Sequence, residues 1–120
     1  MSAFTPKTRR LVIERDGGVC QWCGELVRSD DYSLQHRRAR GMGGSKDPVS
    51  SSPSNAVLMC GSGTTGCHGF VEANPVVAEG RGFRVRQGVD PRHVPLWSWR
   101  GEWWFLLPDG SRVQCEEPPF

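Results

Sequence analysis

The fold is decided by two stretches, Cys20-Gln-Trp-Cys23 and Cys60-Gly-Ser-Gly-Thr-Thr-Gly-Cys67. A structural zinc ion binds four ligands in a tetrahedron, and proteins commonly supply them as two close pairs from separate turns. We therefore expect a structural Zn²⁺ on Cys20, Cys23, Cys60 and Cys67, with Gly24 in the positive-φ conformation that a tight knuckle needs. The alternative is that Cys60 or Cys67 is simply a small buried residue. The fifth cysteine, Cys115, has no predicted role.

The composition explains why such a staple is needed. The chain has 120 residues, the size of one ordinary domain, and glycine (15) and proline (9) make up a fifth of it. Long irregular connections are therefore expected, and a small domain of this kind usually requires a metal or another cross-link. The first twenty residues contain no long apolar run, so we expect no signal peptide, no membrane span and a cytoplasmic protein with reduced thiols.

The remaining pattern predicts an α+β fold. Thr5-Pro6 is a typical helix start, with a hydroxyl cap followed by proline, and it predicts a helix over residues 6–16. Residues 32–36 and 56–59 have the pattern of strands, and the Gly-, Pro- and Ser-rich residues between them predict a long functional loop. A short helix should follow Cys67, and three strand-like runs over about 95–115 predict an antiparallel meander whose core includes at least half of its tryptophans. We expect residues 1–80 to form the main domain, with residues 81–120 a β-rich extension packed on or beside it.

Two of the three histidines, His36 and His68, lie at the ends of the two segments that the cysteine pairs would hold together. His68 and Glu72 are four residues apart on the predicted helix, so both project from one face and could hold a divalent cation. The alternative for Glu72 is an ordinary solvated helix charge. His36, at the end of a predicted strand, is the candidate general base, because an imidazole can take a proton from water at neutral pH. His93 has no such context and is expected on the surface.

At this point the pattern resembles the HNH nuclease family, also called ββα-metal or His-Me finger endonucleases. The matching pieces are Leu34-Gln-His36 with the basic, glycine-rich run to Gly44, then Asn55-Ala-Val-Leu-Met-Cys60, then Cys67-His68-Gly-Phe-Val-Glu72. The glycine-rich pieces are similar to small phage and prophage members with a four-cysteine zinc site. The resemblance implies a zinc-stapled ββα-metal core preceded by a helix and followed by the meander.

The resemblance also implies roles for individual residues. His36 would activate water, Asn55 would hold the loop or orient the site, and His68 would bind the catalytic cation. The residue before the first histidine is commonly an acid or a histidine that binds the same cation; here it is Gln35, a weaker and neutral ligand. Many relatives have a second histidine where this chain has Glu72, which keeps a ligand and adds negative charge. The cation would be Mg²⁺, Mn²⁺, Co²⁺ or Ni²⁺.

The predicted partner is DNA. The positive residues beside His36 should contact backbone phosphates, and they are Arg37, Arg38, Arg40 and Lys46. The implied function is a metal-dependent DNA endonuclease in the cytoplasm, that of the bacterial host if a phage encodes it. Some phage relatives sit beside terminase and assist genome packaging, so terminase is a further predicted partner. The alternative is a zinc-stapled module that binds nucleic acid or terminase and has little catalytic activity.

Overall fold

The computed structural model describes residues 4–28, 30–39 and 48–116, and these residues form three α-helices and two antiparallel sheets. The helices are α1 (Pro6–Arg15), α2 (Gly66–Ala73) and α3 (Pro75–Gly80). The strands are β1 (Tyr32–His36), β2 (Ala56–Cys60), β3 (Leu96–Trp97), β4 (Trp103–Leu106) and β5 (Arg112–Cys115). The α+β class and the predicted positions of the first helix, the two central strands and the meander are confirmed.

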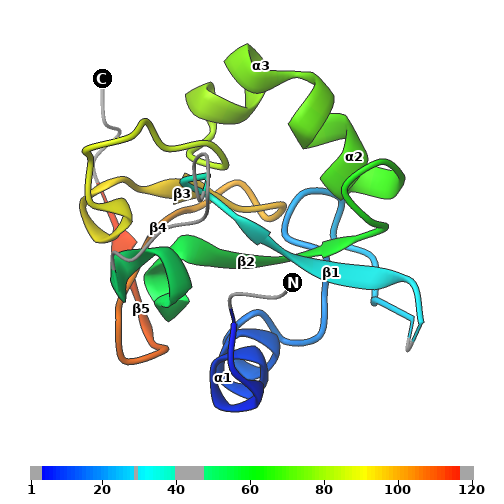
Figure 1. Ribbon diagram of the computed structural model, residues 1–120, viewed down its shortest axis with the longest axis horizontal. Helices are drawn as coiled ribbons and strands as arrows, with labels where there is room; N and C mark the ends of the chain where they lie inside the picture. Colours follow the sequence, from blue (N-terminus) through cyan, green and yellow to red (C-terminus); the bar gives the residue numbers. More distant parts are fainter. Residues whose placement is uncertain (1–3, 29, 40–47, 117–120) are drawn as a thin grey trace.

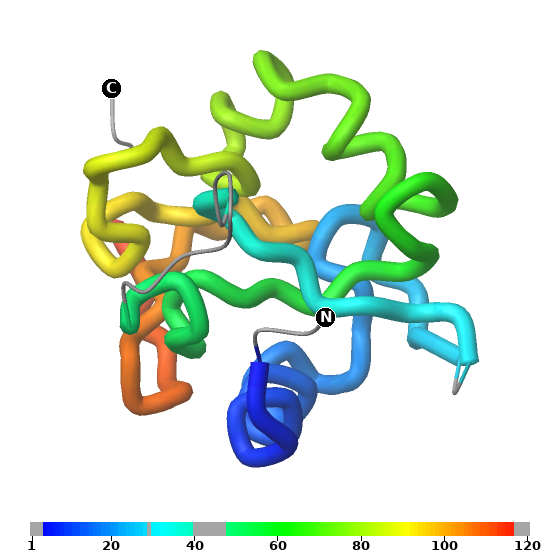
Figure 2. Tube along the Cα trace, in the orientation of Figure 1, coloured from blue at the N-terminus to red at the C-terminus, as the bar shows by residue number. Residues whose placement is uncertain are grey.

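The β1–β2 pair is the centre of the molecule. The strands are antiparallel, with Tyr32 opposite Cys60 and His36 opposite Ala56. Helix α1 lies on one face of this pair, whereas α2 and α3 lie on the other (Figure 1; the same arrangement is visible in the trace of Figure 2). Alternate residues of β2 point to opposite faces, as in any pleated strand. Leu58 packs with the α1 residue Val12 in one core cluster, whereas Val57 and Met59 lie in a second core cluster on the other face.

Helix α1 is attached to β2 by charged side chains. Thr5 caps the helix, since its Oγ1 accepts a hydrogen bond from the Thr8 N–H at 3.1 Å. At the other end, Arg15 donates to the Ala56 carbonyl oxygen at 2.7 Å, and the Asp16 carboxylate accepts from the Leu58 N–H at 3.0 Å. This places α1 on the face of the β1–β2 pair opposite α2 (Figure 1).

The meander has the order β3-β4-β5 and continues the second core cluster. Leu96 and Leu106 are buried in the same cluster as Val57 and Met59, so the C-terminal strands pack directly on the first part of the chain. As predicted, at least half of the tryptophans belong to the meander's core: Trp104 packs on the buried Leu96 and Leu106 cluster, and the half-buried Trp97 and Trp103 rings lie 5.0 Å apart. Trp99 lies beyond the end of β3 and is exposed.

Asn74-Pro75 is expected to interrupt or bend the helix that follows Cys67, and it does: α2 ends at Ala73, and a second helix, α3, begins at Pro75. The described part of the long loop contains two 3-10 turns, Pro48–Ser51 and Pro53–Asn55. Among the described residues no helix is long and apolar enough to cross a membrane.

Candidate active site and metal centre

Four cysteines from two separate turns meet beside the end of β2. The sulfur atoms of Cys20, Cys23, Cys60 and Cys67 all lie within 4.8 Å of one another. Zinc–sulfur bonds of about 2.3 Å in a tetrahedron place the sulfurs roughly 3.8 Å apart, so the cluster has the dimensions of a structural zinc site. The predicted meeting of these four residues is confirmed, and the group can hold a metal such as zinc.

The thiols of this cluster influence one another. Burial raises the pKa of Cys67 strongly, and the neighbouring thiols of Cys60 and Cys20 raise it further. At Cys20 burial also acts to raise the pKa, but backbone N–H groups of Cys23, Cys60 and Trp22 together outweigh it and lower the value. Four thiolates cannot coexist at this separation without a cation, whereas a bound Zn²⁺ would neutralise their mutual repulsion.

Glycines shape both cysteine turns. Gly24 has φ of +83°, as predicted, and the Trp99 ring covers it so closely that an added Cβ would lie 2.5 Å from a ring atom. Gly61 also has φ of +83°, and the N–H of Cys67 donates to the Cys60 sulfur at 3.4 Å. The exposed Trp99 therefore closes the first knuckle from the C-terminal region, a contact that the sequence pattern does not reveal.

His68, the residue after the last cysteine, is buried on α2 and held by a hydroxyl of β1. The Ser33 Oγ lies 2.5 Å from His68 Nδ1 and also donates its proton to the Gly61 carbonyl oxygen at 2.8 Å. A hydroxyl has a single proton, so toward Nδ1 the Ser33 oxygen acts as the acceptor, and His68 carries a proton on Nδ1. The lone pair of the neutral ring is then on Nε2.

The Nε2 atom of His68 faces Glu72. The distance from Nε2 to Glu72 Oε1 is 3.4 Å, and Glu72 is about half exposed. A neutral Nε2 and a carboxylate oxygen are both acceptors, so a cation must lie between them, either a proton on Nε2 or a metal ion. In the protonated arrangement the hydrogen bond from His68 lowers the pKa of Glu72, with smaller contributions from the charges of His68, Arg84 and His36.

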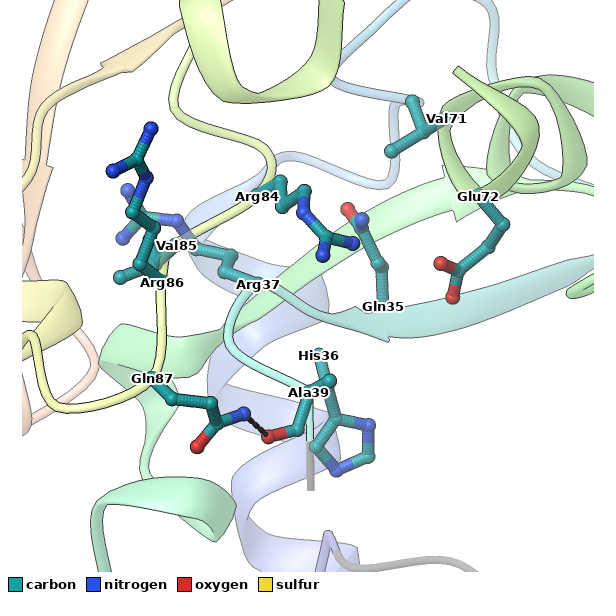
Figure 3. Close-up of a pocket in the computed structure, with 10 residues that line it drawn as sticks. All are labelled: Gln35, His36, Arg37, Ala39, Val71, Glu72, Arg84, Val85, Arg86 and Gln87. Carbon is teal, nitrogen blue, oxygen red and sulfur yellow. Dashed lines mark hydrogen bonds between the residues drawn. The ribbon is translucent and has the colours of Figure 1, made fainter. Parts of the chain in front are cut away.

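A pocket of about 290 Å³ opens beside this pair, at the end of β1. Its walls come from β1, from α2 and from the extended segment 83–87 (Figure 3). The predicted residues Gln35, His36 and Glu72 line it together with Arg84 and Arg86. Three of the residues to which the sequence assigned base or ligand roles therefore share one concave site, with His68 directly behind Glu72.

Gln35 presents an amide oxygen in this site. The residue is 2% exposed, and its Nε2 donates to the Phe83 carbonyl oxygen at 2.9 Å. Within the described ranges its Oε1 is buried and accepts no hydrogen bond. A buried amide oxygen without a hydrogen-bond donor is rare, because it destabilises the folded protein. A cation or a bound water in the pocket would satisfy this oxygen.

The His36 ring stacks on Phe4. The ring centroids lie 4.1 Å apart with an interplanar angle of 17°. Figure 3 shows His36 on the opposite side of β1 from Gln35, as expected for neighbouring residues of a strand. Phe4 therefore holds the orientation of the candidate base, a role for which sequence reasoning had no signal. His93 is exposed, as predicted.

Asn55 is fully buried and joins the chain on the two sides of the long loop. Its Oδ1 accepts from the Arg38 N–H at 2.7 Å, while its Nδ2 donates to the carbonyl oxygens of Arg38 and Ser50 at 3.1 and 3.0 Å. The Asn55 amide thus joins the backbones of Arg38 and Ser50 through hydrogen bonds like those of a sheet. Asn55 does not itself line the pocket; it fixes the start of the loop that follows His36.

Arg37 has a different role from the predicted one. The residue is 1% exposed, and its guanidinium donates to four carbonyl oxygens at 2.6 to 3.0 Å. The acceptors are Gly82, Ser54, Pro91 and Val94. Burial lowers the pKa of Arg37 to about 9, which leaves it cationic at neutral pH. A guanidinium enclosed in this way is not available to a phosphate, so Arg37 is a structural residue.

The other predicted basic residues divide in two. Arg38 is 7% exposed, and its Nη1 donates to the Val89 carbonyl oxygen at 3.1 Å, so it too belongs largely to the interior. Arg40 and Lys46 lie outside the described residues. Exposed positive charge at the pocket comes instead from Arg84 and Arg86, which sequence reasoning missed because they lie outside the quoted motifs.

Comparisons of this chain with protein-family models, with characterised proteins and with solved structures found no match. The functional interpretation therefore rests on the residues and on their geometry.

Proposed function

We propose that this chain is a metal-dependent endonuclease of the HNH type that hydrolyses DNA phosphodiester bonds. The observation that carries the proposal is that Gln35, His36 and Glu72 line one pocket, with His68 Nε2 3.4 Å from the Glu72 carboxylate. Gln35 and His36 come from β1, and His68 and Glu72 come from α2; the order of these elements, two strands and then a helix, is that of a ββα-metal core.

Each residue has a chemical task in this proposal. His36 accepts the proton of the attacking water, and the Phe4 ring keeps its imidazole in one orientation. His68 Nε2, Glu72 and Gln35 Oε1 are the ligands that this chain offers to a catalytic divalent cation, and Ser33 fixes the His68 tautomer. When bound, such a cation neutralises charge that develops on the phosphate and on the leaving oxygen. The four cysteines would hold a structural Zn²⁺ that joins the knuckle to the start of α2.

A plasmid-nicking assay with matched histidine variants tests this proposal. Zinc-loaded wild type should nick DNA with added Mg²⁺, Mn²⁺, Co²⁺ or Ni²⁺, and His36→Ala should lower the rate by about 10²- to 10⁴-fold. His93→Ala is the control, because it makes the same change at an exposed position far from the motif. Zinc content and circular dichroism of each variant should equal those of the wild type.

Two other results would oppose the proposal. If the wild type binds DNA but cleaves it with none of the four cations, the chain is a zinc-stapled binding module, in keeping with the neutral Gln35 at a position where an acid or a histidine is usual. If His36→Ala and His93→Ala cleave equally well, His36 is not the base. A role beside terminase in genome packaging stays a prediction from resemblance.

A further inference from the structure

Residues 84–87 form one wall of the pocket, and burial alternates along the segment 83–87. Phe83 and Val85 are buried, whereas Arg84 and Arg86 are exposed. The Val85 N–H donates to the Arg37 carbonyl oxygen at 2.8 Å, as part of a parallel bridge between Val85 and Arg38. The segment, here named the arginine strap, therefore continues past the end of β1 and directs its two arginines away from the core.

The two arginines of the strap are in different situations. Arg86 forms an ion pair with Glu79, with Nε 3.0 Å from Oε2. Within the described ranges the Arg84 guanidinium makes no hydrogen bond and no ion pair, although its charge contributes to the lowered pKa of Glu72. Figure 3 shows the Arg84 side chain extending across the pocket toward Gln35 and Glu72. Its five N–H donors are thus available inside the pocket.

Buried side chains of β1 and of the residue after it hold the start of the arginine strap in place. The buried Arg37 guanidinium donates to the Gly82 carbonyl oxygen at 2.8 Å, immediately before the strap begins. Gly82 has φ of +79°, and an added Cβ would lie 2.0 Å from the Pro95 carbonyl oxygen, so the chain at this point has no room to move aside. Gln35 Nε2 donates a further hydrogen bond to the Phe83 carbonyl oxygen. The backbone that leads into Arg84 is therefore held in a fixed position relative to β1.

We propose that Arg84 binds a backbone phosphate of the DNA in this pocket, and that Arg37 is the positioning residue that fixes the strap for it. A guanidinium can bind a phosphate through two parallel N–H···O hydrogen bonds. From its wall of the pocket, Arg84 would bind the phosphate that also contacts the cation held by the candidate ligands. The buried, unpartnered Gln35 Oε1 beside it independently indicates that the pocket is built for a polar or charged ligand. This inference rests on the proposed function for the identity of the ligand.

Arg84 should also affect cation binding. The positive charge of Arg84 acts on Glu72, which is also a ligand offered to the divalent cation. Without DNA, Arg84 and the cation repel each other, whereas a bound phosphate neutralises both. Removing the arginine should therefore strengthen cation binding to the free protein and weaken DNA binding, two effects of opposite sign from a single substitution.

The test uses full-length, zinc-loaded protein and a short duplex DNA, with no second metal added, so that binding is measured without cleavage. By fluorescence anisotropy, Arg84→Ala should weaken binding about 5- to 10-fold and reduce the slope of log K against log salt by about 0.9, the value for one phosphate contact. Arg84→Lys should keep the slope and recover only part of the affinity, because lysine lacks the planar fork. Arg28→Ala is the charge-matched control at an exposed position that does not line the pocket.

Calorimetry with Mn²⁺ on the same proteins gives the second readout, and Arg84→Ala should bind the ion several-fold more tightly than Arg28→Ala does. The proposal is overturned if Arg84→Ala equals Arg28→Ala in salt slope and in Mn²⁺ affinity. Failure of the proposed function is a separate result: a wild type that never cleaves DNA, while Arg84→Ala still shows the lost salt slope, removes the nuclease and leaves the phosphate contact standing.

Discussion

The Ser33 hydroxyl lies 2.5 Å from His68 Nδ1 and gives its own proton to the Gly61 carbonyl oxygen. Ser33 comes from β1, whereas His68 comes from α2, so this contact joins the two elements that supply the candidate catalytic residues. Because the hydroxyl proton is already used, Nδ1 must be the donor, and Nε2 is left facing Glu72. The tautomer of His68 is thus set by a residue that coordinates nothing itself.

Removing this hydroxyl should weaken the proposed site for a divalent cation at His68 and Glu72. We expect Ser33→Ala to lower Mn²⁺ affinity about 10- to 100-fold, as substitutions of groups that orient a histidine ligand usually do. Ser33→Thr keeps the hydroxyl and is compatible with a strand, so it should restore most of the affinity. Calorimetric titration of zinc-loaded protein measures both variants. Equal affinities for Ser33→Ala and wild type would show that the contact does not orient the ring.

Metal binding at His68 and Glu72 should release protons. The hydrogen bond from His68 lowers the pKa of Glu72 below its usual 4.5. A carboxyl with a lowered pKa in the folded state adds stability above pH 4.5 and loses it only as the pH falls through that lower value, so Glu72 is ionised at pH 6. Mn²⁺ would take the place of the proton that lies between His68 Nε2 and the Glu72 carboxylate, so affinity should fall as the pH is lowered.

Calorimetry at pH 6 in buffers with different heats of ionisation counts these protons. We expect up to one proton released per Mn²⁺ bound to the wild type. Glu72→Gln should bind the ion at least about tenfold more weakly, because a neutral amide replaces a charged ligand, whereas His93→Gln should leave affinity unchanged. An Mn²⁺ affinity that does not change between pH 5.5 and 7.5 would contradict the assignment of His68.

The zinc prediction separates the four clustered cysteines from the fifth. Cys60→Ser should reduce the zinc content below one ion per chain and lower the thermal midpoint, because folding of small zinc domains depends on the metal. Cys115→Ser makes the same change in β5, outside the cluster, and should keep one zinc. Elemental analysis and thermal unfolding measure the two effects. If Cys60→Ser retains the same zinc content as Cys115→Ser, the cluster is not the zinc site.

Much of this architecture could be predicted from local sequence signals. Thr5-Pro6 marks the start of α1 because a hydroxyl cap and a proline act within one turn, and alternation over residues 32–36 marks β1 to the residue. The meeting of the cysteines could also be predicted, because tetrahedral zinc chemistry relates spacing to geometry. In each case the cause lies within a few residues or in the demands of one ion.

The remaining features depend on contacts between distant segments. Ser33 and His68 are 35 residues apart, and the strap that carries Arg84 is held beside Arg37 by the hydrogen bond from the Val85 N–H to the Arg37 carbonyl oxygen. The prediction that the arginines after His36 contact phosphates assumes that their side chains face solvent. Strand alternation and burial place Arg37 inside instead, so exposed charge in the pocket comes from a segment whose own sequence shows no motif.

The buried Arg37 should therefore be essential for folding stability. Arg37→Ala would leave four carbonyl oxygens without their donor and a cavity in place of the guanidinium, and we expect a loss of about 3 to 5 kcal/mol in the free energy of unfolding. Arg37→Lys keeps the charge but cannot reach four acceptors in one plane, so it should recover only part of this loss. Urea unfolding of zinc-loaded protein measures both variants, with Arg28→Ala as the exposed control, for which the change should stay within about 0.5 kcal/mol. If Arg37→Ala instead unfolds like the wild type and only its DNA affinity falls, Arg37 faces the substrate after all, and the strap has some other anchor.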